Sequence, residues 1–304
     1  MNNNSSLSHR KEEPENGILY IVGTPIGNLN DISQRALNIL KNVSLVACED
    51  TRQTRKIMNK FNISNKLISL NQHNSSIKNP KIIKDLKEGK SIAIVSDAGM
   101  PGICDPGEDI ANSIKSEGLD IICIPGACAA VTALVSSGFP SSSFVFEGFL
   151  PRKEIDRSKI LLEISKNEKT TIIYESPRRL KKLLKELQEF CGGDREIIVA
   201  RELTKKFEEH VGNNINEVIE FFNNKNVIGE ITIVLKGINK NKDLKIDKFS
   251  MKKDLNDLIS AGLTLYTSNL NFVWIAVAVG GLQLISPMTK FCPAHHLALR
   301  AIGN

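Results

Sequence analysis

Loops rich in glycine, proline and acidic residues follow four apolar runs in the first half of the chain. They read VGTPIGN (22–28), CEDTRQTRK (48–56), SDAGMPGICDPG (96–107) and IPGACAAVTAL (124–134). Glycines let a ligand approach the backbone closely, and small residues at a helix start leave its amide groups accessible. The loops therefore predict a small-molecule pocket built largely from backbone groups, with tight turns and close helix packing as the alternative.

Charged side chains in these loops are of the types that transfer protons and bind anions. Glu49 and Asp50 precede a predicted helix, where the helix dipole favours negative charge. Arg52 and Arg55 can offer guanidinium forks to phosphate. Asp97 can accept hydrogen bonds from a ribose or an ammonium group. A salt-bridged, solvated helix start and turn roles for the acids are the alternatives.

The second half of the chain adds two charged segments, YESPRRLKKLLKEL (174–187) and ARELTKKFEEH (200–210). Glu175 and Glu202 end predicted strands, where functional side chains tend to lie. A basic face of this kind can contact phosphates, although a solvated helix face would have the same composition. Its members are Arg178, Arg179, Lys181, Lys182, Lys185, Arg201, Lys205 and Lys206.

Several other kinds of site are not indicated. The first loop is neither GxGxxG nor a phosphate-binding loop with Lys-Ser/Thr. His73, His210, His295 and His296 have no metal-ligand spacing, so we expect no metal site. The six cysteines form no CxxC pair and are typical of small buried residues in a reducing compartment. With no apolar signal segment at the N-terminus, we expect a cytoplasmic protein.

The elements that position the loops alternate between strands and helices. Ile- and Val-rich runs predict strands at 17–23, 44–49, 66–70, 91–97 and 119–126, with amphipathic helices between them. We expect Asp31 to be the N-cap of the first helix. We expect Asp105 to cap the helix that begins directly after Asp105. Such alternation indicates a mainly parallel sheet covered on both faces, with ligands at the carboxyl ends of its strands.

A second α/β unit is expected after Gly148 and Pro151, in the connection FEGFLPRK. Its expected strands span 170–176, 195–202, 207–212 and 229–237, and its expected helices lie near 154–166, 177–190 and 214–224. We predict a disordered lead-in at 1–16, an N-terminal α/β domain at 17–149 and a C-terminal α/β domain at 150–240. Residues 241–304 are interpreted as an atypical tail, in which 258–289 carry no charge.

The amino-acid composition limits the classes of protein to which the chain can belong. The 304 residues are 41% hydrophobic and 24% charged, which excludes a disordered chain, a collagen-like repeat and a polytopic membrane protein. A net charge of +6 permits a polyanionic partner, and the 5% aromatic content argues against base stacking as the main binding device.

The motifs, taken in order and spacing, resemble the tetrapyrrole methylase superfamily, and within it the branch of small-subunit ribosomal RNA methyltransferases. The segments that carry the resemblance are GILYIVGTPIGNLNDISQRAL, VACEDTRQTRKI, SDAGMPGICDPG, FEGFLPRK, YESPRRL and ARELTKKFEE, within about residues 17–237. The resemblance implies two α/β domains with an active cleft between them, S-adenosyl-L-methionine as cofactor and a homodimer. It further implies methylation of the ribose 2′-oxygen of a cytidine in the decoding region of 16S rRNA, on the free RNA or the small ribosomal subunit.

The resemblance also implies roles for individual residues. Pro25 and Gly27 would shape the first loop, and the residues that would line the cofactor are Asp97, Ala98, Gly99, Met100, Cys128, Ala129, Tyr174 and Glu230. Positions at predicted strand ends, rather than the resemblance, give the candidates for the proton-accepting group or its helper: Glu49, Asp50, Glu175, Glu202 and Lys205. Candidates for RNA contact are Arg52, Arg55, Arg178, Arg179 and Arg201; Lys205 is also a candidate for a substrate phosphate.

The chain departs from the family pattern at three places. Cys128 and Cys104 each stand where the branch usually has serine, and the pattern disappears from about Leu265. We hypothesise a frameshift or a replaced gene end there, which re-reading the encoding DNA in the other frames would test. Two alternatives stay open: a methyltransferase acting on a porphyrin precursor, and a non-catalytic relative that binds cofactor or RNA.

Overall fold

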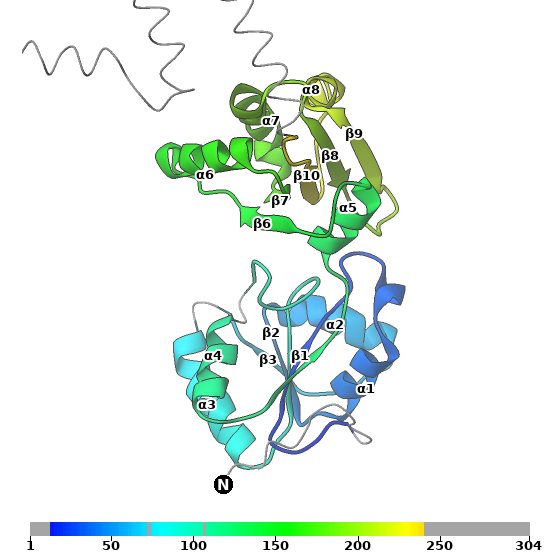
Figure 1. The fold of residues 1–304 in the computed structure, drawn as a ribbon. Helices are drawn as coiled ribbons and strands as arrows, with labels where there is room; N and C mark the ends of the chain where they lie inside the picture. The colour runs from blue at the N-terminus through cyan, green and yellow to red at the C-terminus, as the bar shows by residue number, and fades with distance from the viewer. Residues whose placement is uncertain (1–12, 72–73, 106–107, 240–304) are drawn as a thin grey trace, which may run out of the picture. The chain divides into compact units, whose positions relative to one another are not determined.

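The computed structural model describes residues 13–71, 74–105 and 108–239, and the predicted tail therefore lies outside it. Its strands form two five-stranded sheets (Figure 1). Both sheets belong to one compact unit that ends at Ile238. The mixed α/β fold class expected from the sequence is confirmed.

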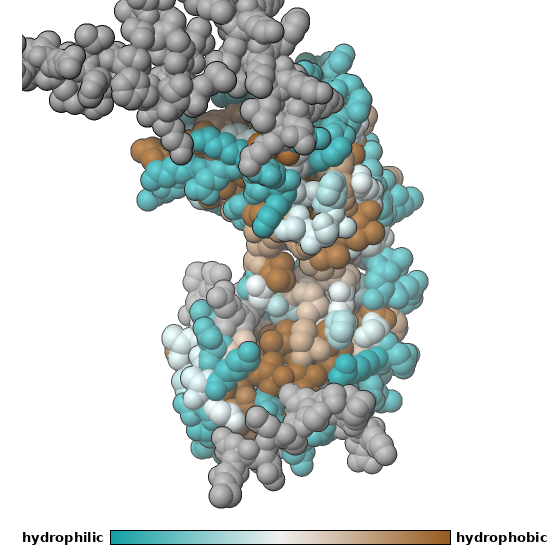
Figure 2. Space-filling model, viewed as in Figure 1, coloured by the Kyte–Doolittle hydropathy of each residue, from teal (hydrophilic) through white to brown (hydrophobic). Residues whose placement is uncertain are grey.

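The first sheet is entirely parallel and has the order β3-β2-β4-β1-β5. Its strands are β1 (Leu19–Val22), β2 (Leu45–Cys48), β3 (Leu67–Ser69), β4 (Ile92–Val95) and β5 (Ile121–Ile124). Its helices are α1 (Gln34–Asn42), α2 (Thr51–Lys60), α3 (Ser75–Lys87) and α4 (Glu108–Ser116). Alternate strand side chains pack against α1 and α2 on one face and α3 and α4 on the other, which explains the continuous apolar runs. In Figure 2 hydrophobic residues gather over these strands, and hydrophilic residues cover the flanking helices.

The second sheet is mixed and has the order β6-β7-β10-β8-β9, in which only the β6–β7 pair is parallel. Its strands are β6 (Phe144–Phe149), β7 (Thr170–Glu175), β8 (Glu196–Arg201), β9 (Glu209–Asn214) and β10 (Ile231–Leu235). The remaining helices are α5 (Ala129–Ser137), α6 (Glu154–Lys166), α7 (Pro177–Cys191) and α8 (Ile215–Asn223).

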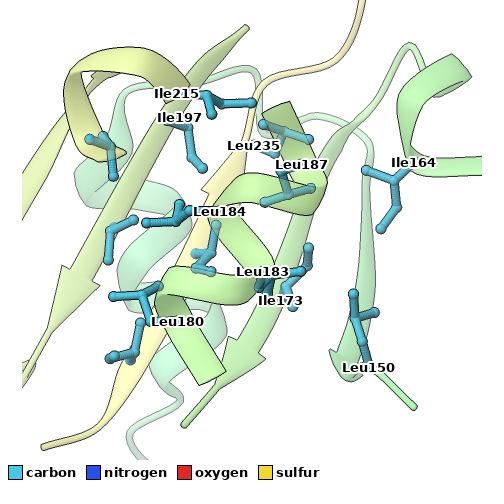
Figure 3. Close-up of a cluster of buried hydrophobic side chains, with 14 of the residues drawn as sticks. Leu150, Ile164, Ile173, Leu180, Leu183, Leu184, Leu187, Ile197, Ile215 and Leu235 are labelled. Carbon is cyan, nitrogen blue, oxygen red and sulfur yellow. The ribbon is translucent and has the colours of Figure 1, made fainter. Parts of the chain in front are cut away.

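The core of the second sheet is built around α7. Leu180, Leu183, Leu184 and Leu187 recur at helical spacing and are all buried against the sheet (Figure 3). The opposite face of the sheet is covered by α5, whose small residues, such as Ala133, pack against it. Helix α5 therefore joins the end of the first sheet to the second, which brings loops of both sheets together.

Strand β6 is the main element that the sequence prediction did not contain. Residues 144–149 were expected to close the N-terminal domain, but they pair with β7 in the second sheet. The change of sheet falls between β5 and β6, ahead of the expected boundary at 149–150. The strand was missed because it is irregular: Gly148 has φ +61° and the register shifts between Phe146 and Gly148.

Three further expectations need comment. Residues 13–16 of the expected disordered lead-in make contacts, since the Glu13 carboxylate lies 2.6 Å from Arg35. The expectation of buried cysteines is wrong for Cys104 and Cys123, which are exposed, although Cys48 is buried. Within the described ranges, no helix is long and apolar enough to span a membrane.

The expected N-cap of the first helix is corrected. Asp31 ends a short 3₁₀ turn, η2 (Leu29–Asp31), and α1 begins three residues later. The cap is Ser33, whose Oγ accepts a hydrogen bond from the Ala36 N–H at 3.1 Å. The intervening 3₁₀ turn is too short to show in the apolar periodicity, and both residues are good caps by type.

This correction generates a matched pair of variants. Ser33→Ala is expected to lower the free energy of unfolding by about 1 kcal/mol, because the Ala36 N–H loses its partner. Asp31→Ala is expected to change it by less than about 0.5 kcal/mol, the range of ordinary surface substitutions. Urea unfolding followed by circular dichroism measures both, and a larger loss for Asp31→Ala would restore the sequence-based assignment.

Candidate active site

A cavity of about 490 Å³ is formed by loops at the carboxyl ends of β1, β2, β4 and β5 together with residues of the second sheet. This volume is within the range of about 300–1,000 Å³ that is typical of small-molecule sites. The cavity is lined by Ile26, Glu49, Asp97, Ala98, Gly99, Met100, Ile103, Cys104, Asp105, Cys128, Ala129, Phe149, Tyr174, Glu175, Ser176, Pro177, Gly229, Glu230, Ile231 and Thr232. Ten of the residues singled out in the sequence are thus brought together.

Backbone contacts between glycines hold three of the loops to one another. A Cβ atom at Gly23 would lie only 2.6 Å from the Cα of Gly126, so the loops after β1 and β5 touch through bare backbone. The first loop is also paired with the third, because Thr24 N–H donates to Gly99 O at 2.9 Å and Gly99 N–H donates to Thr24 O at 3.2 Å. Gly23 is therefore used for close approach of another loop, and it does not line the cavity.

Aromatic rings from the second sheet close one wall of the cavity. Tyr174 lies edge-on to Phe146 at 5.0 Å and tilted to Phe149 at 5.6 Å between ring centroids. Its hydroxyl oxygen accepts a hydrogen bond from Ala130 N–H at 3.0 Å, at the start of α5. Burial, with smaller effects from Cys128 and Cys104, raises the pKa of Tyr174, so this hydroxyl stays neutral at physiological pH. Tyr174 therefore fixes the helix start against the cavity rather than acting as a base.

Three carboxyl groups from the first sheet's loops also line the cavity: Glu49 and Asp97 just after the neighbouring strands β2 and β4, and Asp105 further along the loop after β4. One Asp97 oxygen accepts the Asp50 N–H at 3.0 Å, which ties the loop after β2 to the loop after β4. Burial raises the pKa of Glu49, and the charges of Asp97, Asp105 and Asp50 raise it further. Burial likewise raises the pKa of Asp105, which the sequence analysis had interpreted as a helix cap. No lysine or arginine is paired with Glu49 within the described residues.

Two other acidic candidates are neutralised by arginine. Asp50 caps α2 and lies 2.7 Å from Arg52. Hydrogen bonds from the side chain and the backbone N–H of Arg52 lower the pKa of Asp50 to about 2. Glu175 is buried, lines the cavity, and lies 3.0 Å from Arg179. An arginine already holds each of these carboxyl groups, so neither is placed to take a proton from a substrate. Asp50 and Glu175 are therefore placed to hold structure and charge, and Asp50 does not line the cavity.

The last two candidates, Glu202 and Lys205, form one ionic cluster with Glu230. Lys205 Nζ lies 2.8 Å from Glu202 and 2.9 Å from Glu230. Burial disfavours the charged forms of Glu202 and Lys205, but the hydrogen bonds of this cluster outweigh the effect of burial. The pKa of Glu202 is therefore lowered, and the pKa of Lys205 is raised. Of the three, only Glu230 lines the cavity. A Cβ atom at Gly27 would lie 2.5 Å from the Lys205 side chain, so the cluster also packs against the first loop.

The arginines named as RNA contacts divide into two groups. Arg179 donates to Leu150 O and Arg201 pairs with Glu209, so both brace the second sheet. Arg52, Arg55 and Arg178 are exposed, and Arg52 keeps its pair with Asp50. Pro25 belongs to the first loop and does not line the cavity. His73, His295 and His296 lie outside the described residues, within which no group of three His, Cys, Asp or Glu side chains is arranged for a metal ion.

Half of the residues that line the cavity were not expected from the sequence to be site residues. Ile26, Ile103, Cys104 and Asp105 stand inside motifs that were recognised, but their side chains gave no functional signal. Phe149 was treated as part of a connection. The others not singled out are Ser176, Pro177, Gly229, Ile231 and Thr232. These residues lie next to Glu175 or Glu230 in the sequence. Their position beside a candidate site residue was the one feature that could have indicated them.

The family profile described as Tetrapyrrole (Corrin/Porphyrin) Methylases matches residues 18–219. The chain therefore belongs to the tetrapyrrole methylase family, and it is a methyltransferase. Solved structures share the fold at low identity. Cobalt precorrin-4 methyltransferase superposes with a TM-score of 0.57 at 18% identity, over 72% of this chain and 95% of that one. Uroporphyrin-III C-methyltransferase from Thermus thermophilus, complexed with S-adenyl homocysteine, gives 0.51 at 14% identity, over 72% and 96%.

Closer relatives within the family carry one name, ribosomal RNA small subunit methyltransferase I. The protein of that name from Thermotoga maritima is 46% identical over 221 residues, which cover 73% of this chain and 99% of the relative. The Bacillus subtilis protein is 44% identical over 253 residues, which cover 82% and 86%. The resemblance stated from the motifs is confirmed.

The glycine contact between the first and fourth loops can be tested directly. Gly23→Ala is expected to abolish methyl transfer per folded molecule, because its Cβ would clash with the Gly126 backbone and separate the loops. Gly89→Ala is the control: φ is +87° there, so alanine is strained, but nothing lies within 4 Å and the site is at the other end of β4. Activity normalised to the folded fraction by circular dichroism separates the two. Equal activity of both variants would contradict the role of the contact.

Proposed function

We propose that the protein transfers a methyl group from S-adenosyl-L-methionine to the ribose 2′-oxygen of a cytidine in the decoding region of 16S rRNA. The observation that carries the proposal is the cavity, in which the glycine loops after β1, β4 and β5 meet several carboxyl groups, among them Glu49, which makes no ion pair within the described residues. The name of the two relatives described above, which are 44–46% identical to this chain, supports a small-subunit rRNA substrate.

The residues of the cavity fit this cofactor chemically. S-adenosyl-L-methionine carries a sulfonium and an ammonium group, and it supplies an electrophilic methyl group when bound. Asp97, which makes no ion pair within the described residues, complements those positive charges, and Met100 and Ile231 offer apolar contact. Gly99 has φ +81°, and a Cβ there would lie 3.2 Å from Ile26, so the backbone itself forms the surface at this point. We assign cofactor contact to this part of the cavity.

We propose Glu49 as the group that accepts the ribose hydroxyl proton. Methyl transfer needs the oxygen aligned with the methyl carbon and its proton removed, and a carboxylate with a raised pKa accepts a proton better than an ordinary one. Glu49 lines the cavity, its pKa is raised by burial and by neighbouring acids, and no cation within the described chain pairs with it. Asp50, Glu175, Glu202 and Lys205 act in this proposal as positioning residues.

The exposed arginines supply the electrostatic contact with RNA in this proposal. Arg52 and Arg55 lie on the exposed face of α2, whose start adjoins Glu49, and Arg178 is exposed at the start of α7. Guanidinium groups at these places can bind backbone phosphates while the target ribose reaches the cavity. We further propose that the protein acts in the cytoplasm as a homodimer, on 16S rRNA or the small ribosomal subunit.

The proposed substrate can be tested in cells and in vitro. Deleting the gene is expected to remove one 2′-O-methyl group from the decoding region of 16S rRNA, and the purified protein is expected to restore it on 16S rRNA or subunits from the deletion strain. Primer extension at low nucleotide concentration and mass spectrometry of digested rRNA detect the modification. Unchanged 16S rRNA, with methylation of an added porphyrin precursor, would assign the protein to the tetrapyrrole class instead.

The proposed base has a matched control in the adjacent residue. Glu49→Gln is expected to lower the rate of methyl transfer by about 10²–10⁴-fold, the usual contribution of a positioned base. It should not lower stability at neutral pH, since a carboxyl group whose pKa is raised by folding destabilises the fold when ionised. Asp50→Asn keeps a capping side chain and lies outside the cavity, so its rate should stay close to wild type.

The pH dependence of the wild type gives an independent readout. Glu49 must be ionised to accept a proton, and its pKa is raised above the ordinary value of 4.5. The rate is therefore expected to fall on the acid side at a pH above 4.5. This acid limb should be absent from the residual activity of Glu49→Gln. A wild-type acid limb that persists in Glu49→Gln would assign the titration to another group.

A further inference from the structure

A second groove, of about 330 Å³, lies on the second sheet beside the cavity. It is lined by Arg201, Glu202, Phe207, Glu209, Phe222, Lys225, Asn226, Val227 and Ile228. Its wall continues directly into the cavity, because Ile228 lines the groove while Gly229 and Glu230 line the cavity. Two hydrogen bonds join the sides of this shared wall: Glu202 N–H donates to Glu230 O at 2.9 Å, and Glu230 N–H donates to the Glu202 carboxylate at 3.0 Å.

Two large apolar side chains stand exposed at this groove. Phe207 is 66% exposed and Ile228 is 64% exposed. Phe207 belongs to the loop between β8 and β9, and Ile228 belongs to the segment before β10. Exposed apolar side chains that gather at a concave surface usually mark a place where a partner binds. The groove is therefore a candidate for the part of the substrate that lies beside the reacting nucleotide.

The loop that carries Phe207 is held by its own hydrogen bonds. Thr204 N–H donates to the Glu208 carboxylate at 2.7 Å, and Glu208 N–H donates to Lys205 O at 3.2 Å. Thr204 Oγ1 also accepts the N–H of Asn28 at 3.0 Å, which fixes the loop to the first loop of the cavity. The exposed ring is thus presented on an ordered support and loses little conformational entropy when a partner binds.

Cations flank the exposed ring. Lys206 Nζ lies 5.5 Å from the centroid of the Phe207 ring, and Lys206 makes no ion pair within the described residues. Lys225, which also lines the groove, lies over the Phe221 ring and 3.8 Å from Glu209. An exposed aromatic ring beside a free ammonium group is the combination that binds single-stranded RNA, since a base stacks on the ring while the cation contacts the phosphate.

We propose that Phe207 and Ile228 form a stacking site for an unpaired base of the rRNA, next to the nucleotide that is methylated, and that Lys206 contacts the adjoining phosphate. This assignment rests on the proposed function, because it takes RNA as the substrate. It gives the loop a role that the ionic cluster of Lys205 does not explain. The groove would hold the target strand in register with the cavity, and stacking of this kind accepts any base.

The test uses the full chain and a fluorescein-labelled single-stranded oligoribonucleotide with the sequence of the 16S decoding region. Phe207→Ala is expected to weaken binding by about 5- to 150-fold, the usual effect of removing one base–aromatic contact. Phe207→Trp should retain binding, and Lys206→Ala should weaken binding and reduce its dependence on salt. Ile155→Ala, which removes a 74% exposed side chain from α6, is the matched control and should bind like wild type.

The readouts separate this inference from the proposed function. Calorimetry with S-adenosyl-L-methionine should give wild-type affinity for Phe207→Ala, because Phe207 does not line the cavity. If the wild type methylates 16S rRNA and Phe207→Ala binds the RNA as tightly as the wild type does, the stacking site alone is overturned. Unchanged RNA binding together with weakened self-association in sedimentation would make the groove a contact between copies. A wild type that neither binds nor methylates the RNA overturns the proposed function itself.

Discussion

The site depends on how closely the backbone of one loop can approach another. Gly23 faces Gly126 with no space for a side chain on either residue, and Gly27 faces the Lys205 side chain in the same way. These contacts join loops that leave the first sheet at different strands to a loop of the second sheet. A cavity that accepts a ligand through backbone groups can form only where such side chains are absent. The other features of the site follow from this constraint.

One consequence is the distribution of charge around the cavity. The loops bring several carboxyl groups to one edge, and the arginines and lysines that balance some of them come from the same short segments. Arg52 is two residues from Asp50, and Arg179 is four residues from Glu175. Glu49 has no such partner in the described chain, and burial together with the charges of the neighbouring acids raises its pKa. Local pairing therefore separates acids that look equivalent in the sequence into those held by an arginine and those, such as Glu49, that pair with no cation in the described residues.

The sequence predicted the parts of the fold that depend on local pattern. Short apolar runs such as 91–97 indicated parallel strands, and glycine and proline at their ends indicated the loops of the cavity, which the structure brings together. Strand β6 was missed because Gly148 and the register shift interrupt its pattern. Ser33 and Asp31 were indistinguishable as caps because residue type alone favours both.

The site was harder to predict than the fold, since contacts between segments distant in sequence determine it. Asp50 and Glu49 are neighbours, yet only Glu49 reaches the cavity. Arg179 and Arg201 were taken as RNA contacts by residue type, but their side chains hold Glu175 and Glu209. Ile231 and Thr232 line the cavity as part of β10, and no local signal marks a strand residue as part of a site. Which side chains are left without an ion-pair partner can be seen only once both sheets have formed.

If loops of both sheets build one cofactor cavity, a bound cofactor product must protect segments of both sheets. Hydrogen–deuterium exchange of the full chain, with and without S-adenosylhomocysteine, measures this protection. We expect slower exchange in 96–100 and 126–130, from the first sheet, and also in 229–232, from the second. Saturable binding that protects neither sheet's segments, or the segments of one sheet alone, would contradict it.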